Sequence, residues 1–200
     1  MSQLQDTVSF LKKHGPCRAR EIEAAGYRRQ DLQYLIKSGK VERLARGIYQ
    51  VAKAEILTNP GYAELFLRSP KVVICLLSAL HFHELTTQLP HEVWIALGTN
   101  SRAPKLNYPP LRVVHFSELA FTKGIEIHKV DGISFRVYSV AKTVADLFKM
   151  RNKVGLDVAM EALREALRAR KTTRAEIIKM AKICRMEKIM RPYLEMEAVA

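Results

Sequence analysis

The sequence has few cysteines and no pattern that would join them. Cys17, Cys75 and Cys184 lie far apart in the 200-residue chain, and no two of them form a Cys-x-x-Cys pair. An odd and scattered set does not build a disulfide framework or a cysteine-based zinc site. We therefore expect three reduced thiols in a cytoplasmic protein.

Long apolar runs are lacking as well. The longest run, VVICLLSAL at residues 72–80, is far shorter than the roughly 20 apolar residues that span a bilayer. The first residues lack the charged-then-apolar pattern of a secretory signal. We expect no membrane partner, and the 48% share of apolar residues indicates a globular chain.

Catalytic and metal-binding motifs are missing too. The chain has no Walker loop, GxGxxG, GxSxG or HExxH motif, and its central acids show no motif spacing. His81 and His83 are the one local pair of residues of a metal-binding type. On the helix expected there, residues two apart lie on different faces, so the two side chains could not share a metal ion. The sequence therefore predicts no metal, no cofactor and no catalytic residue.

What the sequence has in excess is positive charge, +13 in total with a pI near 9.8. Eleven basic side chains face six acidic ones up to Leu57, and 14 face six from Val140 to Pro192, whereas the centre is nearly neutral. A balance of this kind favours polyanions such as nucleic acid as partners. Two basic ends indicate two separate basic surfaces.

The first 57 residues predict a winged helix-turn-helix. Apolar spacing indicates helices over 4–13 and from Arg18 to Ala25, closed by Gly26, and a third helix that turns Leu32, Leu35 and Ile36 inward and ends at Gly39. Two β-prone runs, VERLA and IYQV, then flank Arg46-Gly47 as a hairpin. Short helices followed by a basic hairpin are typical of this DNA-binding motif.

The outer side of the third helix carries residue types that read base edges. Arg can form two hydrogen bonds with guanine and Gln two with adenine, while Lys, Tyr and the hairpin arginines suit phosphates or the minor groove. The alternative is an ordinary solvated helix, which the joint presence of a basic hairpin makes less favourable. The predicted DNA contacts are Tyr27, Arg28, Arg29, Gln30, Gln33, Tyr34, Lys37, Arg43, Arg46 and Lys53.

Asn59-Pro60-Gly61 marks the expected boundary between a domain 1–57 and a domain 58–200. Beyond it the pattern predicts an α+β domain with a small, mostly antiparallel sheet. Residues 72–85 favour a buried helix, although their first half also suits a strand. Strands are predicted at EVWIAL, LRVVHF, GIEIHKV and ISFRVY, the last two joined through Asp131-Gly132.

The last part of the chain predicts three helices with basic outer faces. Ser139 can cap the first, in which Val140, Val144, Leu147 and Phe148 face inward; the second runs from Leu156 to Arg170, and the third starts at Thr172 or Thr173. Local pairs with Glu161, Glu165 and Glu176 do not balance the charge. The predicted second basic surface, for DNA or a protein, comprises Arg164, Arg168, Arg170, Lys171, Arg174, Lys179, Lys182, Arg185 and Lys188.

Three segments together resemble the AbiEi-type antitoxins of type IV toxin–antitoxin systems. They are DLQYLIKSGKVERLARGIYQV, with its L-x-R-G-x-Y pattern at Leu44 to Tyr49, then LLSALHFHEL, then FRVYSVAKTVADLF. The resemblance implies an N-terminal winged helix-turn-helix that binds inverted repeats in the promoter of its own operon and represses it. It also implies a C-terminal domain that counters a nucleotidyltransferase-type toxin, and no enzymatic activity.

Two other functions fit the sequence less well. One is a ligand-responsive regulator in which the central sheet senses a small molecule. The other is a nucleic-acid-processing enzyme that uses the histidines or Asp146, the one acid in an apolar helix; a structural role as partner of a basic side chain or as a cap suits that acid better. We expect a monomer that places two copies on DNA, or a weak dimer.

Overall fold

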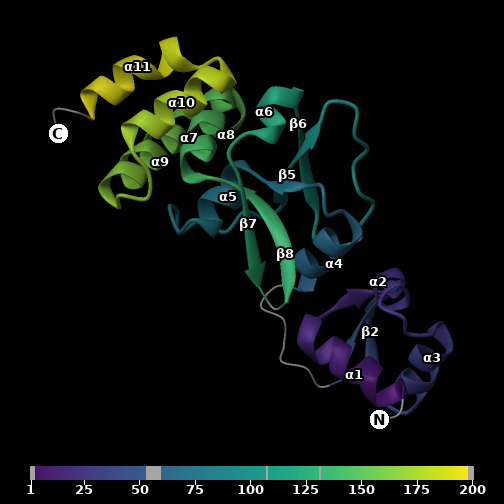
Figure 1. Ribbon diagram of the computed structural model, residues 1–200. Coiled ribbons are helices and arrows are strands. Elements are labelled where there is room, and N and C mark those ends of the chain that lie inside the picture. Colours follow the sequence, from purple (N-terminus) through teal and green to yellow (C-terminus); the bar gives the residue numbers. More distant parts are fainter. Residues whose placement is uncertain (1–2, 53–59, 107, 131, 198–200) are drawn as a thin grey trace. The chain divides into compact units, whose positions relative to one another are not determined.

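The computed structural model describes residues 3–52, 60–106, 108–130 and 132–197 (Figure 1). The chain divides into two compact units. The first comprises Met1–Pro70 with His128–Phe135, and the second comprises Lys71–Ile127 with Arg136–Ala200. Each unit has a buried apolar core of its own.

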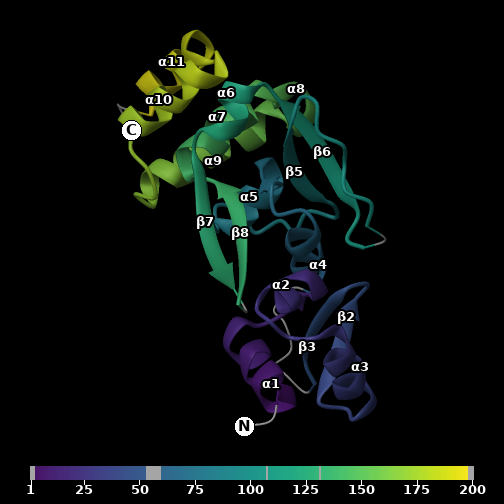
Figure 2. The ribbon, with the colours of Figure 1, turned by 45° about the vertical axis from the view of Figure 1, so that its right-hand side comes forward.

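The first unit begins with three helices, α1 (Gln3–His14), α2 (Ala19–Ala24) and α3 (Arg29–Lys37). Helix α1 packs against α3 and against the strand β3 (Ile48–Val51), as can be followed in Figure 2. The core between them contains Leu11, Ile22, Leu32 and Leu35, each at most 2% exposed. The predicted helices are therefore confirmed, because their apolar spacing is the spacing of the buried side chains.

A three-stranded antiparallel sheet completes this part of the unit, in the order β1-β3-β2. Strand β2 (Val41–Ala45) and β3 form the predicted hairpin, and β1 (Cys17–Arg18) adds a short strand that the sequence does not signal. The inward position expected for Ile36 is wrong, since that side chain is 36% exposed. Leu32 and Leu35 already fill the stripe that faces the core.

Helix α4 (Pro60–Arg68) follows, and a five-stranded sheet then runs in the order β6-β5-β4-β8-β7. Its strands are β4 (Val73–Ile74), β5 (Val93–Gly98), β6 (Leu111–Phe116), β7 (Ile125–Val130) and β8 (Ile133–Tyr138). Four of them lie at the predicted strands, and the α+β class is confirmed. Asp131, which belongs to the predicted turn between β7 and β8, lies outside the described residues.

The strand directions are more mixed than the sequence predicts. β4 pairs antiparallel with β5, but β4 pairs parallel with β8 and β5 pairs parallel with β6. A parallel pair needs a connection of about a dozen residues, and the segment 99–110 is long enough to return the chain to the same end of the sheet. Residues 72–85 also differ from a single helix: they form β4 and then α5 (Leu76–Phe82).

Helices cover the remainder of the second unit. The short α6 (Glu118–Thr122) and α8 (Arg151–Val154) and the terminal α11 (Glu187–Met196) were not expected, whereas α7 (Val140–Lys149), α9 (Leu156–Arg168) and α10 (Arg174–Cys184) were. The Ser139 side chain accepts a hydrogen bond from the backbone N–H of Lys142 and so caps α7 as predicted. Leu156, the first residue of α9, is 40% exposed.

Helix α7 lies at the centre of this unit and packs against α5, α9 and α10. The four side chains predicted to face inward from it are all buried. Across the described parts of the chain, no helix is both long and apolar enough to cross a membrane.

Candidate nucleic-acid interface

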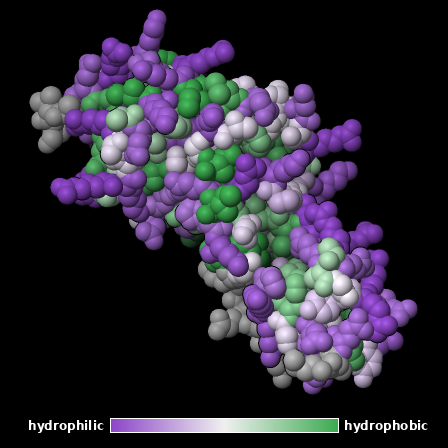
Figure 3. Space-filling model, in the orientation of Figure 1, coloured by the Kyte–Doolittle hydropathy of each residue, from purple (hydrophilic) through white to green (hydrophobic). Residues whose placement is uncertain are grey.

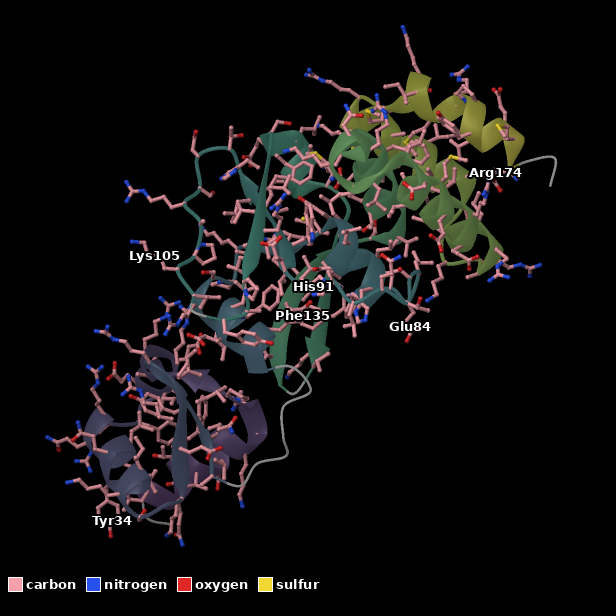
Figure 4. The ribbon with its side chains drawn as sticks, turned by 180° about the vertical axis from the view of Figure 1, so that it is seen from behind. Tyr34, Glu84, His91, Lys105, Phe135 and Arg174 are labelled. Atoms are coloured by element: carbon pink, nitrogen blue, oxygen red, sulfur yellow. The ribbon has the colours of Figure 1, made fainter. Side chains whose placement is uncertain are left out.

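The outer face of α3 is built from polar side chains that take no part in the core. Leu32 and Leu35 anchor the helix on the inner side, while Gln30, Gln33 and Lys37 are exposed. Tyr34 is 59% exposed and lies at the outer surface of the helix in Figure 4. The predicted base-reading residues of this helix thus share one solvent-facing side. Hydrophilic side chains cover most of the visible face of this unit (Figure 3).

Two arginines stand at the N-terminal end of α3. Arg28 occupies the cap position, and its Nε lies 3.3 Å from Oδ2 of Asp31. The Nε of Arg29 lies 3.7 Å from Oε1 of Glu23 on α2. Since the N-terminus of a helix already carries partial positive charge, two guanidinium groups there favour the approach of an anion.

The hairpin presents its basic residues at and near the turn. Gly47 has φ +78°, a backbone conformation that glycine adopts readily, so the turn places Arg46 outward at the tip. The exposed Arg43 donates from Nε to the backbone oxygen of Ala45 at 3.2 Å, which holds it beside the strand. Lys53, also predicted to contact DNA, lies outside the described residues.

Tyr27 differs from the other predicted contacts. Its ring packs 5.2 Å from the ring of Phe10 and joins the edge of the apolar core, so it is half-buried. Packing against α1 therefore accounts for this tyrosine better than a hydrogen bond with DNA.

Arg18 and Arg20 belong to this surface, although the sequence pattern does not single them out. A groove is lined by both, by Ala19 and Glu23, by Arg29 from α3, by Arg46, Gly47 and Ile48 from the hairpin, and by Arg68 from α4. Burial lowers the pKa of the Arg18 guanidinium, and the positive charge of Arg20 lowers it further. The pairing of β1 with β3 brings these residues to the hairpin, and a two-residue strand leaves no periodic signal in a sequence.

The predicted second basic surface is exposed but largely paired. All nine of its side chains belong to exposed residues of the second unit. Arg164 pairs with Glu197 at 2.7 Å, Arg168 with Glu165 at 2.8 Å, and Lys182 with Glu187 at 3.8 Å. Lys171 donates to the backbone oxygen of His83, and Arg174 to that of Glu197.

Of the local pairs expected here, the one between Arg168 and Glu165 is present. Arg164 pairs instead with Glu197, and Glu176 closes the capping box of α10 with Thr173. These contacts neutralise a good part of the local charge, so this surface is a weaker candidate for phosphates than the groove of the first unit.

Asp146 is fully buried, and its two oxygens are both engaged. Its carboxylate accepts from Nζ of Lys142, which is also fully buried, and from Sγ of Cys184 at 3.2 Å. The structural role expected for this acid is therefore confirmed, with a lysine as the basic partner. A carboxylate so enclosed is out of reach of a substrate.

His83 and the three cysteines also lie in environments that suit a structural role. His83 ends α5, and its Nε2 lies 2.7 Å from the backbone oxygen of Tyr138. Among the described residues no group of three His, Cys, Asp or Glu side chains could hold a metal ion. The three cysteines are free and buried. Burial raises the pKa of Cys17 to about 11 and that of Cys184 to about 12, which disfavours the reactive thiolate.

Comparison with known proteins gives a family match to the segment that contains α3 and most of the groove. No curated protein matches the chain. One family model does match, over residues 6–52, and its description is "Transcriptional regulator, AbiEi antitoxin". That range runs from α1 to the end of the β2–β3 hairpin. The resemblance to the AbiEi antitoxins is thereby confirmed for this part of the chain: residues 6–52 are similar to the AbiEi family of antitoxin transcriptional regulators.

Proposed function

We propose that this protein is a transcriptional repressor that binds inverted repeats in the promoter of its own operon and also acts as an antitoxin. The family match over residues 6–52 carries the proposal. It falls on the segment whose exposed helix face and hairpin tip carry arginine, glutamine and lysine. On this proposal, residues 1–57 form a winged helix-turn-helix and residues 58–200 an antitoxin domain.

The first unit supplies the two elements that such a motif needs. Helix α3 would enter the major groove, where Gln30 and Gln33 face the base edges and Arg29 stands at the N-terminal end of the helix. The β2–β3 hairpin would lie along the flanking backbone, with Arg46 against phosphates or in the minor groove. An inverted repeat takes two copies of the chain, one on each half-site, whether they meet as monomers or as a weak dimer.

Substitutions on α3 and at the hairpin separate base reading from phosphate binding. Gln33→Ala is expected to lower discrimination between the operator and a scrambled duplex by about 1–3 kcal/mol, because a bidentate base contact is lost. Arg46→Ala is expected to weaken binding to both duplexes alike. Fluorescence anisotropy with labelled promoter DNA measures both effects, and Lys13→Ala on α1 is the control for charge.

Arg29→Ala is expected to resemble Arg46→Ala, with weaker binding to operator and scrambled duplex alike. Wild-type affinity in all three variants would show that α3 and the hairpin do not face DNA. Analytical ultracentrifugation of the free and DNA-bound protein gives the number of copies on each operator.

The antitoxic activity is assigned to residues 58–200 and directed at a nucleotidyltransferase-type toxin. The test is co-expression of such a toxin, encoded beside this protein, with the full chain and with a variant defective in DNA binding such as Arg46→Ala. Rescue of growth by both would place neutralisation outside the DNA interface. Failure of the wild-type chain to rescue growth would contradict the antitoxin part of the proposal and leave the repressor part intact.

A groove in the second unit supports one other candidate, a ligand-responsive regulator. It is lined by apolar side chains that include Leu80, Leu85 and Trp94, together with the polar His91 and Glu92. A metabolite bound there would raise the melting temperature of the protein and shift its affinity for DNA. Thermal-shift screening in the presence and absence of operator DNA tests this function.

A further inference from the structure

Five arginines from five separate elements line the groove of the first unit. One of them, Arg68, ends α4 and is paired with Glu64 at 3.0 Å. Of the other four, Arg18 ends β1, Arg20 lies in the first turn of α2, Arg29 begins α3 and Arg46 belongs to the hairpin turn. Strand pairing, a backbone hydrogen bond and an ion pair hold these elements together. Arg18 pairs in register with Ile48.

Two further contacts fix the walls of the groove. The backbone N–H of Ala19 donates to the backbone oxygen of Gly47 at 3.0 Å, and this bond ties the start of α2 to the hairpin turn. The ion pair between Arg29 and Glu23 joins α3 to α2. The fold itself therefore brings these arginines together from separate elements.

Their charge is poorly balanced within the protein. Of the described residues that line the groove, Glu23 is the one acid, and its contact with Arg29 is long at 3.7 Å. No carboxylate of the described chain forms an ion pair with Arg18, Arg20 or Arg46. Like charges this close repel one another, and an anion bound among them would relieve that repulsion.

Arg18 provides a second and independent observation. Its Nη2 atom is buried and has no hydrogen-bond partner in the structure. A buried guanidinium nitrogen without an acceptor is unfavourable, and a site of this kind commonly marks a place for an ion or a bound group. A small adjustment of the side chain on binding would give that nitrogen an acceptor.

We propose that Arg18, Arg20, Arg29 and Arg46 together clamp one phosphodiester of the DNA backbone, at the junction of α2, α3 and the hairpin. The inference rests on the proposed DNA binding and adds Arg18 and Arg20 to it. Planar guanidinium groups match the oxygens of a phosphate, and four of them from different elements suit a single anion better than a base edge. The contact carries no sequence information, but it fixes the position of α3 along the duplex.

The test compares two variants of equal charge in the full chain. Arg18→Gln/Arg20→Gln removes two guanidinium groups from the groove, and Lys12→Gln/Lys13→Gln removes two charges from α1. Binding to operator and to scrambled DNA is measured between 0.05 and 0.3 M salt. The single variant Arg20→Gln, which alters an exposed side chain, guards against misfolding of the double variant, and circular dichroism checks both.

The loss of one neutralised phosphate is expected to make the negative slope of log K against log salt shallower by about 0.9. Counted from 1 M, that slope corresponds to roughly eightfold weaker binding at 0.1 M salt, for operator and scrambled DNA alike. The α1 variant is expected to change the slope much less. A slope and affinity for Arg18→Gln/Arg20→Gln equal to those of the α1 variant would overturn the clamp.

Failure of the clamp and failure of the proposed function give different results. If the wild-type chain does not bind its promoter, the DNA-binding function itself is wrong. If it binds and the arginine variants bind equally well, only the clamp is wrong. Inorganic phosphate, titrated without DNA, tests a free anion as the ligand: stabilisation lost in Arg20→Gln, with DNA binding unchanged, would assign the groove to small phosphates instead.

Discussion

The buried ion pair of α7 gives a quantitative test of the second unit. Both Lys142 and Asp146 have fully buried side chains. The Lys142 Nζ lies 4.1 Å from the centre of the Tyr138 ring, and Asp146 also accepts from Cys184. Asp146→Asn would leave an ammonium group enclosed without its counter-charge. The expected loss in the free energy of unfolding is about 3–5 kcal/mol, a large part of the 5–15 kcal/mol typical of a domain.

Replacement of both partners is expected to behave differently. Lys142→Met/Asp146→Leu removes the two charges together, and a well-packed apolar pair is often neutral or more stable by about 1–4 kcal/mol. Glu165→Gln, in the exposed pair with Arg168, is the matched control and is expected to cost at most about 1 kcal/mol. A double-mutant cycle then separates the coupling of the two charges from their individual costs.

Trp94 makes the measurement specific for this unit. It is the chain's single tryptophan, it lies in β5, and it is 8% exposed, so its fluorescence reports unfolding of the second unit in urea. A decrease in the free energy of unfolding below about 1 kcal/mol for Asp146→Asn would refute the reasoning, because a buried charge without a partner destabilises a domain by more than that. Unchanged circular dichroism in the native baseline confirms that each variant still folds.

Three further outcomes follow from the backbone and the caps. Gly124→Ala is expected to cost about 2–4 kcal/mol, because φ is +71° and the new Cβ would lie 2.7 Å from Cβ of Lys142. Gly47→Ala would have similar backbone strain, but its new Cβ would meet no atom within 4 Å. Chemical unfolding should therefore show a decrease in the free energy of unfolding of only about 1 kcal/mol. Backbone and threonine hydrogen bonds lower the pKa of Glu176. Its capping contribution to stability is therefore present above about pH 4.5 and is lost as the pH falls through the lower pKa of the folded state. In Glu176→Gln, stability measured by chemical unfolding should depend less on pH in this range.

The sequence predicts regular elements well wherever one period dominates. α1, α3 and α7 each bury a stripe at helical spacing, and both hairpin runs of the first unit lie at their predicted residues. Short elements were missed because they leave no period to detect. β1 is two residues long and is stabilised by pairing with β3, a partner thirty residues away in the chain.

Strand direction could not be predicted from local patterns. A buried strand has the same apolar pattern in a parallel and in an antiparallel pair, so the sequence predicts a mostly antiparallel sheet although β5 and β6 pair parallel. Strand direction depends on how the connecting residues return the chain to the sheet, which local apolar patterns do not encode. For the same reason the helix expected at 72–85 became β4 and α5: the central place in the sheet, with Val73 and Ile74 fully buried, favours strand over helix.

The candidate site was predicted in part. The exposed face of α3 and the tip of the hairpin lie at the residues that the pattern predicts, but no pattern singles out Arg18 and Arg20. Their contribution depends on tertiary contacts with the hairpin turn. Conversely, the charge of the C-terminal helices looked unbalanced in the sequence because Glu197, far along the chain, pairs with Arg164 only in the folded state.

Helix α3 separates the side chains that stabilise the fold from those that face solvent, and this bears on how the DNA specificity of such a regulator can change. Leu32 and Leu35 hold the helix in the core, while Gln30, Gln33 and Tyr34 are exposed and support no other part of the fold. Substitutions on that outer face are therefore close to neutral for stability. Under the proposed function, duplicated copies of this gene could acquire separate operators by changing a few surface residues, without compensating changes inside the domain.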